Sequence, residues 1–139
     1  MGDAPTLEER ADSEDGIARV FRGHLKAVTA CAYSADGSRI LSASRDNTLR
    51  ERDRSSGQEL RRFEGHSNRV TACAYSPDGS RILSASSDNT LRIWSRNDSR
   101  CLDIVYRAAA FDCIATTRGH LTAGDALGNV WMLECDWLD

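Results

Sequence analysis

The chain of 139 residues contains a long internal repeat. Residues 23–50 recur as residues 65–92, 42 positions later, and the two copies differ at only five positions. Periods of about 20 to 50 residues are typical of proteins that stack or radially arrange one small structural unit. Because two nearly identical segments fold alike, the repeat restricts this chain to a tandem array of one unit.

Each copy consists of short apolar segments that alternate with turn residues. Runs of this length and pattern predict strands, and the Asp-Gly and Asp-Asn pairs between them favour tight reversals. The strands predicted for the first copy are residues 28–34, 40–44 and 48–53. Further strands are predicted just before the units, at residues 17–21, 59–63 and 101–106.

Three features of the repeat resemble the WD40-repeat family: Gly-His at the start, Ser-Pro-Asp-Gly or Ser-Ala-Asp-Gly in the middle, and Asp-Asn-Thr-Leu-Arg-Ile-Trp at the end. The resemblance implies an all-β fold of β-propeller blades, each a four-stranded antiparallel meander. It also implies a non-catalytic scaffold that binds a protein or peptide. The chain has room for about three such blades.

The third unit is divergent. Residues 111–115 align with the strand at 71–75 and residues 129–133 with 90–94, so Gly119-His120 does not open a new unit and His120 is predicted in a loop. An atypical last repeat is expected of an array that needs a cap. The predicted division is an acidic arm at 1–15 and repeats at 16–139, with blade-forming units at about 23–63, 65–106 and 107–135.

Three blades fall short of a closed ring, since propellers need about four to eight. Open strand edges and apolar faces favour association. We therefore expect a homo-oligomer of two or three copies, in which the strand at 17–21 pairs with residues 130–133 of another copy. The alternatives are a fragment of a larger multidomain signalling protein and a purely structural self-assembling module.

The resemblance also implies a buried structural tetrad in each clear unit, in which Asp, His, Ser and Trp form a hydrogen-bonded relay. Such a trio of Ser, His and Asp recurs in both units, with no oxyanion site or strained nucleophile turn beside it, so we do not expect an enzyme. The resemblance leaves open which of the two Ser residues of each unit takes part. The tetrad candidates are His24, Ser42, Ser44, Asp46, His66, Ser84, Ser86, Asp88 and Trp94.

The first unit lacks the terminal Trp, because Glu51 and Arg52 stand where Ile93 and Trp94 stand. Two charges at covered positions are costly unless they are paired. Either the long side chains reach solvent past a loosened strand, or they face another subunit or a partner.

Four of the five differences between the copies adjoin the Gly-His loop or the turn Asp, where the family presents its channel mouth. A fixed framework with variable loop residues is typical of a recognition surface, although unconstrained exposed positions also vary. Arg side chains bind carboxylates and phosphates, so the expected ligand is an acidic or phosphorylated peptide. The candidate partner-binding residues are Leu25, Lys26, Ala27, Arg45, Ser67, Asn68, Arg69 and Ser87.

The composition is that of a globular protein, with 40% hydrophobic residues, 28% charged residues and a net charge of −3. The acidic balance argues against nucleic acid as a partner, and no apolar run is long enough to cross a membrane. Five cysteines without metal-ligand spacing predict a reducing, cytoplasmic location and neither metal nor cofactor. In the acidic arm, Thr6 and Glu9 have capping-box spacing, which predicts a short helix at 7–11.

Overall fold

The computed structural model describes residues 7–9 and 19–136 and contains no α-helix among them. Three antiparallel sheets, here called blades 1 to 3, account for most of these residues. Blade 1 consists of β3 (Val28–Tyr33), β4 (Arg39–Ser44), β5 (Leu49–Asp53) and β6 (Glu59–Phe63). Blade 2 consists of β7 (Val70–Tyr75), β8 (Arg81–Ser86), β9 (Thr90–Ser95) and β10 (Cys101–Tyr106). Blade 3 consists of β11 (Phe111–Thr117), β12 (His120–Asp125) and β13 (Val130–Glu134).

Within each blade, consecutive strands pair in an antiparallel meander. The first turn of blade 1 shows why the sequence reverses there. The Asp36 carboxylate accepts hydrogen bonds from the Ser34 hydroxyl (2.8 Å) and the Ser38 N–H (2.9 Å), and Gly37 takes a φ of 72°, which a residue with a Cβ adopts at a cost. Blade 2 repeats this turn at Gly79, with a φ of 76°.

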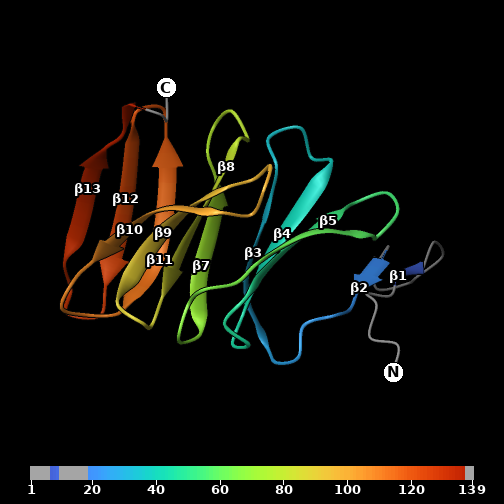
Figure 1. The fold of residues 1–139 in the computed structure, drawn as a ribbon, viewed down its shortest axis with the longest axis horizontal. Helices are drawn as coiled ribbons and strands as arrows, with labels where there is room; N and C mark the ends of the chain where they lie inside the picture. The colour runs from blue at the N-terminus through green and yellow to red at the C-terminus, as the bar shows by residue number, and fades with distance from the viewer. Residues whose placement is uncertain (1–6, 10–18, 137–139) are drawn as a thin grey trace.

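The three blades stand side by side, from blade 1 at the right to blade 3 at the left of Figure 1. Their first strands, β3, β7 and β11, are neighbours. Hydroxyl groups connect these strands, because Thr71 Oγ1 donates to the Phe111 carbonyl (2.6 Å) and Thr116 Oγ1 donates to the Tyr75 carbonyl (3.1 Å). The predicted all-β architecture of about three propeller-like blades is confirmed.

The hydrophobic core lies between the blades. Leu41, Leu49 and Phe63 of blade 1 pack against Ile82 and Trp94 of blade 2. The other face of blade 2 presents a second cluster to blade 3, formed by Leu83, Leu91 and Ile93 with Phe111 and Leu121.

One face of each end blade is left without a neighbouring sheet. On blade 1, Val28 is 54% exposed and Tyr33 is 66% exposed. On blade 3, Val130 and Met132 are 78% and 67% exposed. Their counterparts in blade 2, such as Val70, Tyr75 and Ile93, are buried because blades cover both faces there.

Two local predictions, on residues 7–11 and on His120, are wrong. Leu7–Glu9 is a strand, β1, instead of part of a helix, and the remaining helix residues lie outside the described residues. The strand predicted at 17–21 is described as β2 (Arg19–Phe21), which pairs with β1 within the chain. The pairing of this strand with residues 130–133 of another copy stays a prediction. His120 is the first residue of β12, opposite Thr117 and Glu134, as Arg81 is the first residue of β8, opposite Ser95.

Candidate functional site

A buried polar relay crosses blade 2. The indole Nε1–H of Trp94 donates to Ser84 Oγ (2.9 Å), which lies 2.6 Å from His66 Nε2, and His66 Nδ1 lies 2.8 Å from Asp88 Oδ2. The Ser84 hydroxyl therefore donates to Nε2, and the proton on Nδ1 is donated to the carboxylate. Each polar group finds a partner, which matters because a buried orphan costs about 1–3 kcal/mol.

The electrostatics keep this relay in one protonation state. Burial lowers the pKa of His66 despite the opposing effect of Asp88, so the imidazole is neutral. Burial alone would raise the pKa of Asp88, but hydrogen bonds from Thr90, His66 and the Ser67 N–H together lower it. The carboxylate is therefore ionised. Ser84 is fully buried, so no substrate reaches its hydroxyl in this conformation.

Blade 1 contains the same relay with one replacement. His24 Nδ1 lies 2.9 Å from Asp46 Oδ2 and its Nε2 lies 2.7 Å from Ser42 Oγ. In place of an indole, the Nη1–H of Arg52 donates to Ser42 Oγ at 3.4 Å. Arg52 thus occupies the position of Trp94 and supplies the fourth group of the relay.

Ser44 and Ser86 do not join the relays. Ser44 Oγ donates to the Ala27 carbonyl (2.9 Å) and accepts from the Asp46 N–H (3.0 Å), and Ser86 makes the equivalent bonds in blade 2. Both lie at the end of their strand, beside the turn, whereas Ser42 and Ser84 lie deeper. They connect the Gly-His loop to the turn that carries the Asp.

The structure places Glu51 inside the protein. It is fully buried between blades 1 and 2, where it accepts hydrogen bonds from Tyr75 Oη (2.8 Å) and Arg96 Nε (2.9 Å). Burial and the neighbouring carboxylate raise the pKa of Tyr75, so its phenol stays protonated and donates. Neither predicted alternative describes Glu51, since it faces the next blade of its own chain.

Blade 3 uses a different network, which the sequence analysis missed. Asp125 accepts from Trp131 Nε1 (2.8 Å) and Asn129 Nδ2 (3.1 Å), and these bonds help to lower its pKa to about 2. The Arg107 guanidinium lies over the Trp131 ring, 4.6 Å from its centroid. Asp125 ends β12 as Ser86 ends β8, so it does not stand at the position of Asp88, and the alignment with the first two units gave no signal for this network.

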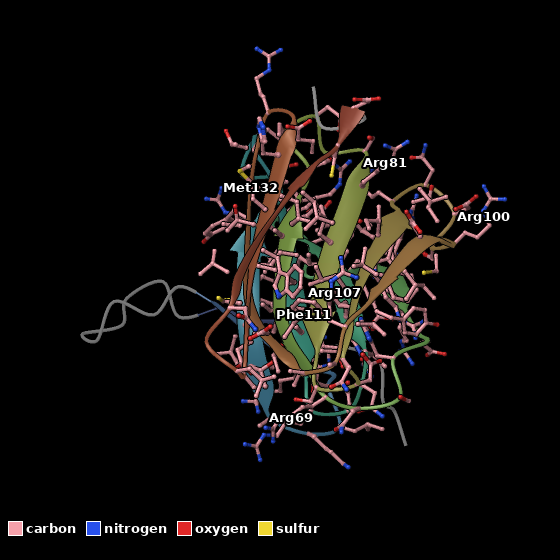
Figure 2. The ribbon with its side chains drawn as sticks, turned by 90° about the vertical axis from the view of Figure 1, so that its left-hand side faces the viewer. Arg69, Arg81, Arg100, Arg107, Phe111 and Met132 are labelled. Carbon is pink, nitrogen blue, oxygen red and sulfur yellow. The ribbon has the colours of Figure 1, made fainter. Side chains whose placement is uncertain are left out.

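The eight candidate partner-binding residues, here called the rim, lie in the Gly-His loops and turns at one end of the blades. Hydrogen bonds join each loop to its turn, from the Arg45 N–H to the Ala27 carbonyl (2.9 Å) and from the Ser87 N–H to the Arg69 carbonyl (3.1 Å). Arg69 marks this end in Figure 2. All rim residues are exposed except Ser87, which is half-buried.

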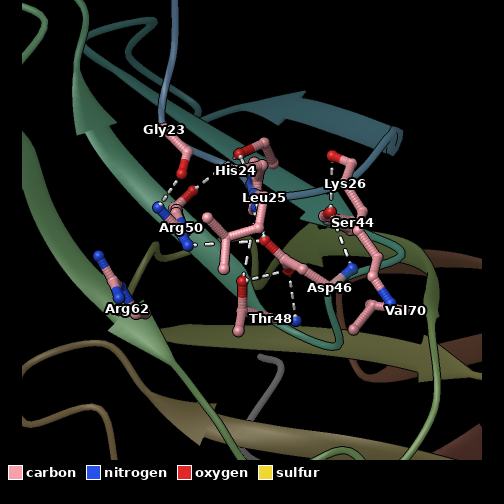
Figure 3. Close-up of polar contacts among 12 residues, drawn as sticks. Gly23, His24, Leu25, Lys26, Ser44, Asp46, Thr48, Arg50, Arg62 and Val70 are labelled. Carbon is pink, nitrogen blue, oxygen red and sulfur yellow. Dashed lines mark hydrogen bonds and ion pairs between the residues drawn. The ribbon is translucent and has the colours of Figure 1, made fainter. Parts of the chain in front are cut away.

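The relays hold the rim in place. Asp46 Oδ2 accepts from the Leu25 N–H (3.1 Å) as well as from His24, as Figure 3 shows. Asp88 does the same for the Ser67 N–H (3.1 Å). The backbone of each rim loop is thus fixed by a buried carboxylate, while the side chains project outward.

The charge of the rim is positive. Lys26, Arg45 and Arg69 are exposed and take part in none of the ion pairs formed by the described residues. Arg69 Nε donates to Ser87 Oγ at 3.2 Å. Leu25 adds an apolar side chain that is 82% exposed.

Within residues 7–9 and 19–136, no cluster of three or more His, Cys, Asp or Glu side chains could hold a metal ion. A helix of sufficient length and apolarity to cross a membrane is likewise absent from this part of the chain.

Comparisons with known proteins agree with the geometry. A family model described as WD domain, G-beta repeat, matches residues 16–51 and 57–95, more than half of the chain. The solved structure of the WD40 beta propeller domain of Doa1 is similar, with a TM-score of 0.73 and 26% sequence identity. That match covers 78% of this chain and 37% of the other, so the chain spans well under half of that protein. No curated protein matches. The chain belongs to the WD40-repeat family, as its repeat and its Gly-His, Asp and Trp positions predict.

Proposed function

We propose that this chain is a non-catalytic interaction module whose rim binds a protein or peptide bearing carboxylate or phosphate groups. The observation that carries the proposal is the rim itself, a set of exposed and cationic side chains on loops held by buried carboxylates. Loops positioned by a rigid scaffold are the usual place for binding residues.

The chemistry of the rim favours an anionic ligand. Arg45 and Arg69 carry guanidinium groups, which bind carboxylate or phosphate oxygens through two parallel hydrogen bonds. Lys26 adds a third positive charge, and Leu25 gives an apolar contact beside them. Because no acidic side chain neutralises these cations within the described chain, a ligand would not have to displace an internal partner.

The test compares rim and non-rim charges. The variant Lys26→Asn with Arg45→Ser replaces two cations by the residues found at the same positions of blade 2. Because the same loop and turn carry these residues in blade 2, the variant should keep the fold. Fluorescence anisotropy with labelled peptides that contain glutamate or phosphoserine should give an affinity about three- to tenfold weaker for this variant. The control is Arg100→Ser, which removes an exposed cation away from the rim (Figure 2) and should leave affinity unchanged. Equal binding of glutamate peptides and their glutamine counterparts would refute the proposal.

The second part of the proposal is that copies of the chain close the ring. Exposed Val28 and Tyr33 on blade 1 and Val130 and Met132 on blade 3 are apolar surface that a neighbouring blade would cover. Native mass spectrometry should find two or three copies. A folded monomer at micromolar concentration would contradict closure by copies and favour further blades from a longer polypeptide.

A further inference from the structure

Arg52 is a buried cation with no carboxylate of the described residues in direct contact; the carboxylate that acts on it at longer range is that of Glu59, on the neighbouring strand. Its side chain is 3% exposed, and no carboxylate of the described residues lies within 4 Å of it. Nη1 donates to Ser42 Oγ (3.4 Å) and Nη2 donates to the Arg22 carbonyl (3.1 Å), while Nε has no acceptor. A guanidinium offers five N–H donors, so most of its capacity is unused.

Arg52 lines a cavity of about 370 Å³ on the outer face of blade 1. The wall is apolar at Phe21, Val28 and Ile40 and cationic at Arg22, Lys26 and Arg52. His24 also lines it, and burial lowers the pKa of that imidazole, so it adds no positive charge near neutral pH. In blade 2 the residue at the position of Arg52 is Trp94, and its ring packs against Phe63 at 5.8 Å between centroids.

The guanidinium groups next to Arg52 on this face of blade 1 have carboxylate partners. Arg50 is within 3.5 Å of both Asp46 and Glu59, and Glu59 is also shared with Arg62 at 3.0 Å. Arg62 also lies 3.9 Å from Glu64. Arg50 and Arg62 thus have carboxylate partners, whereas Arg52 forms no ion pair with any described residue.

Glu51, the neighbour of Arg52 on β5, is also buried and charged, but it has partners. Glu51 and Arg52 point to opposite faces of β5, since successive strand residues alternate. Glu51, on the covered face, meets a cation and a phenol from blade 2. Arg52, on the uncovered face, has no such partner, although burying a charge costs several kcal/mol unless it is paired.

We propose that the cavity beside Arg52 is a binding site for a single carboxylate group, which accepts hydrogen bonds from the unused N–H donors of Arg52. The planar fork of a guanidinium matches the two oxygens of a carboxylate, and Lys26 at the wall adds a further positive charge that favours an anion. The carboxylate comes either from a small organic acid or from an acidic side chain of the copy that covers blade 1.

The test follows the Arg52 Nε–H signal by nuclear magnetic resonance in the full chain. Sodium acetate should shift this signal with saturation, whereas sodium chloride at the same ionic strength should not. In Arg52→Gln, the backbone N–H signals of Gly23 and Lys26 report the cavity, and half-saturation by acetate should need a concentration about tenfold higher or more. A second variant, Arg52→Trp, installs the residue of blade 2 and should abolish the response while keeping the relay to Ser42.

Two arms separate the sources of the carboxylate. If the next copy supplies it, the Arg52 signal shifts as the chain is concentrated without acetate, and the shift follows the oligomer mass. If a small acid supplies it, the signal responds to acetate and not to protein concentration. A non-saturating acetate response, or an equal response in Arg52→Gln, would overturn the proposal whether or not the rim binds peptides.

Discussion

Removal of the Glu51 carboxylate tests the interface between blades 1 and 2. Glu51 is fully buried and is held by Tyr75 and by Arg96, whose side chain is 15% exposed. Breaking a buried pair by removing one partner costs about 3–5 kcal/mol. Because Arg96 retains some access to water, we expect Glu51→Ala to lower the free energy of unfolding by about 3 kcal/mol, the lower end of that range.

The assay is urea unfolding followed by the fluorescence of the buried Trp94. Glu64→Ala removes an exposed carboxylate that is 3.9 Å from Arg62, so it serves as the matched control and should cost less than about 0.5 kcal/mol. A double-mutant cycle between Glu51→Ala and Arg96→Ala should give a coupling of about 1–3 kcal/mol. If the free energy of unfolding of Glu51→Ala lies within about 0.5 kcal/mol of that of the original chain, the buried pair does not contribute to stability and the argument from burial is refuted.

The relays and turns give three further expectations. Ser84→Ala leaves His66 Nε2 and Trp94 Nε1 without partners and should cost about 2–4 kcal/mol in urea unfolding. By contrast, Ser86→Ala should mainly speed hydrogen exchange of the Asp88 N–H, which donates to Ser86 Oγ. The pKa of His66 is lowered in the folded state, so the unfolded chain binds more protons as the pH falls below about 6.5, and stability declines there. The urea midpoint should therefore drop between pH 7 and pH 5, and the slope should be smaller in His66→Gln; equal slopes would contradict the role of burial. In Gly79→Ala the added Cβ has no atom within 4 Å, but the residue must keep a φ of 76°. The free energy of unfolding should therefore fall by only about 1–2 kcal/mol, and a larger decrease would contradict a purely conformational cost.

The internal repeat predicted the strands and the placement of the relay residues in one blade after another. Hydrophobic alternation and the Asp-Gly turns depend on residues that are close in the sequence, so the strands and turns can be predicted from the sequence alone. The bonds of Glu51 are different, because Tyr75 and Arg96 belong to the next blade and come close only once the blades are packed. For the same reason the sequence did not show that Arg52 would stand in for an indole.

Blade 3 shows a second limit of prediction from the sequence. Its first strand, β11, extends to Thr117 before the short turn at Gly119, so His120 pairs with Thr117 and with Glu134 instead of lying in a loop. Its Asp125–Trp131 bond replaces the His-Ser-Trp relay with residues six positions apart. A pattern learned from the first two units does not contain this solution, because Asp125 stands at the position of Ser86, not of Asp88.

Asp46 Oδ2, which binds both His24 and the Leu25 N–H, affects which substitutions the chain tolerates at Leu25. What the buried Asp holds is a main-chain group, and every residue except proline carries that group. Mutations to other side chains at this position would therefore alter the outward chemistry while leaving the anchoring bond intact. New ligand preferences could then arise there by single substitutions with little penalty to folding.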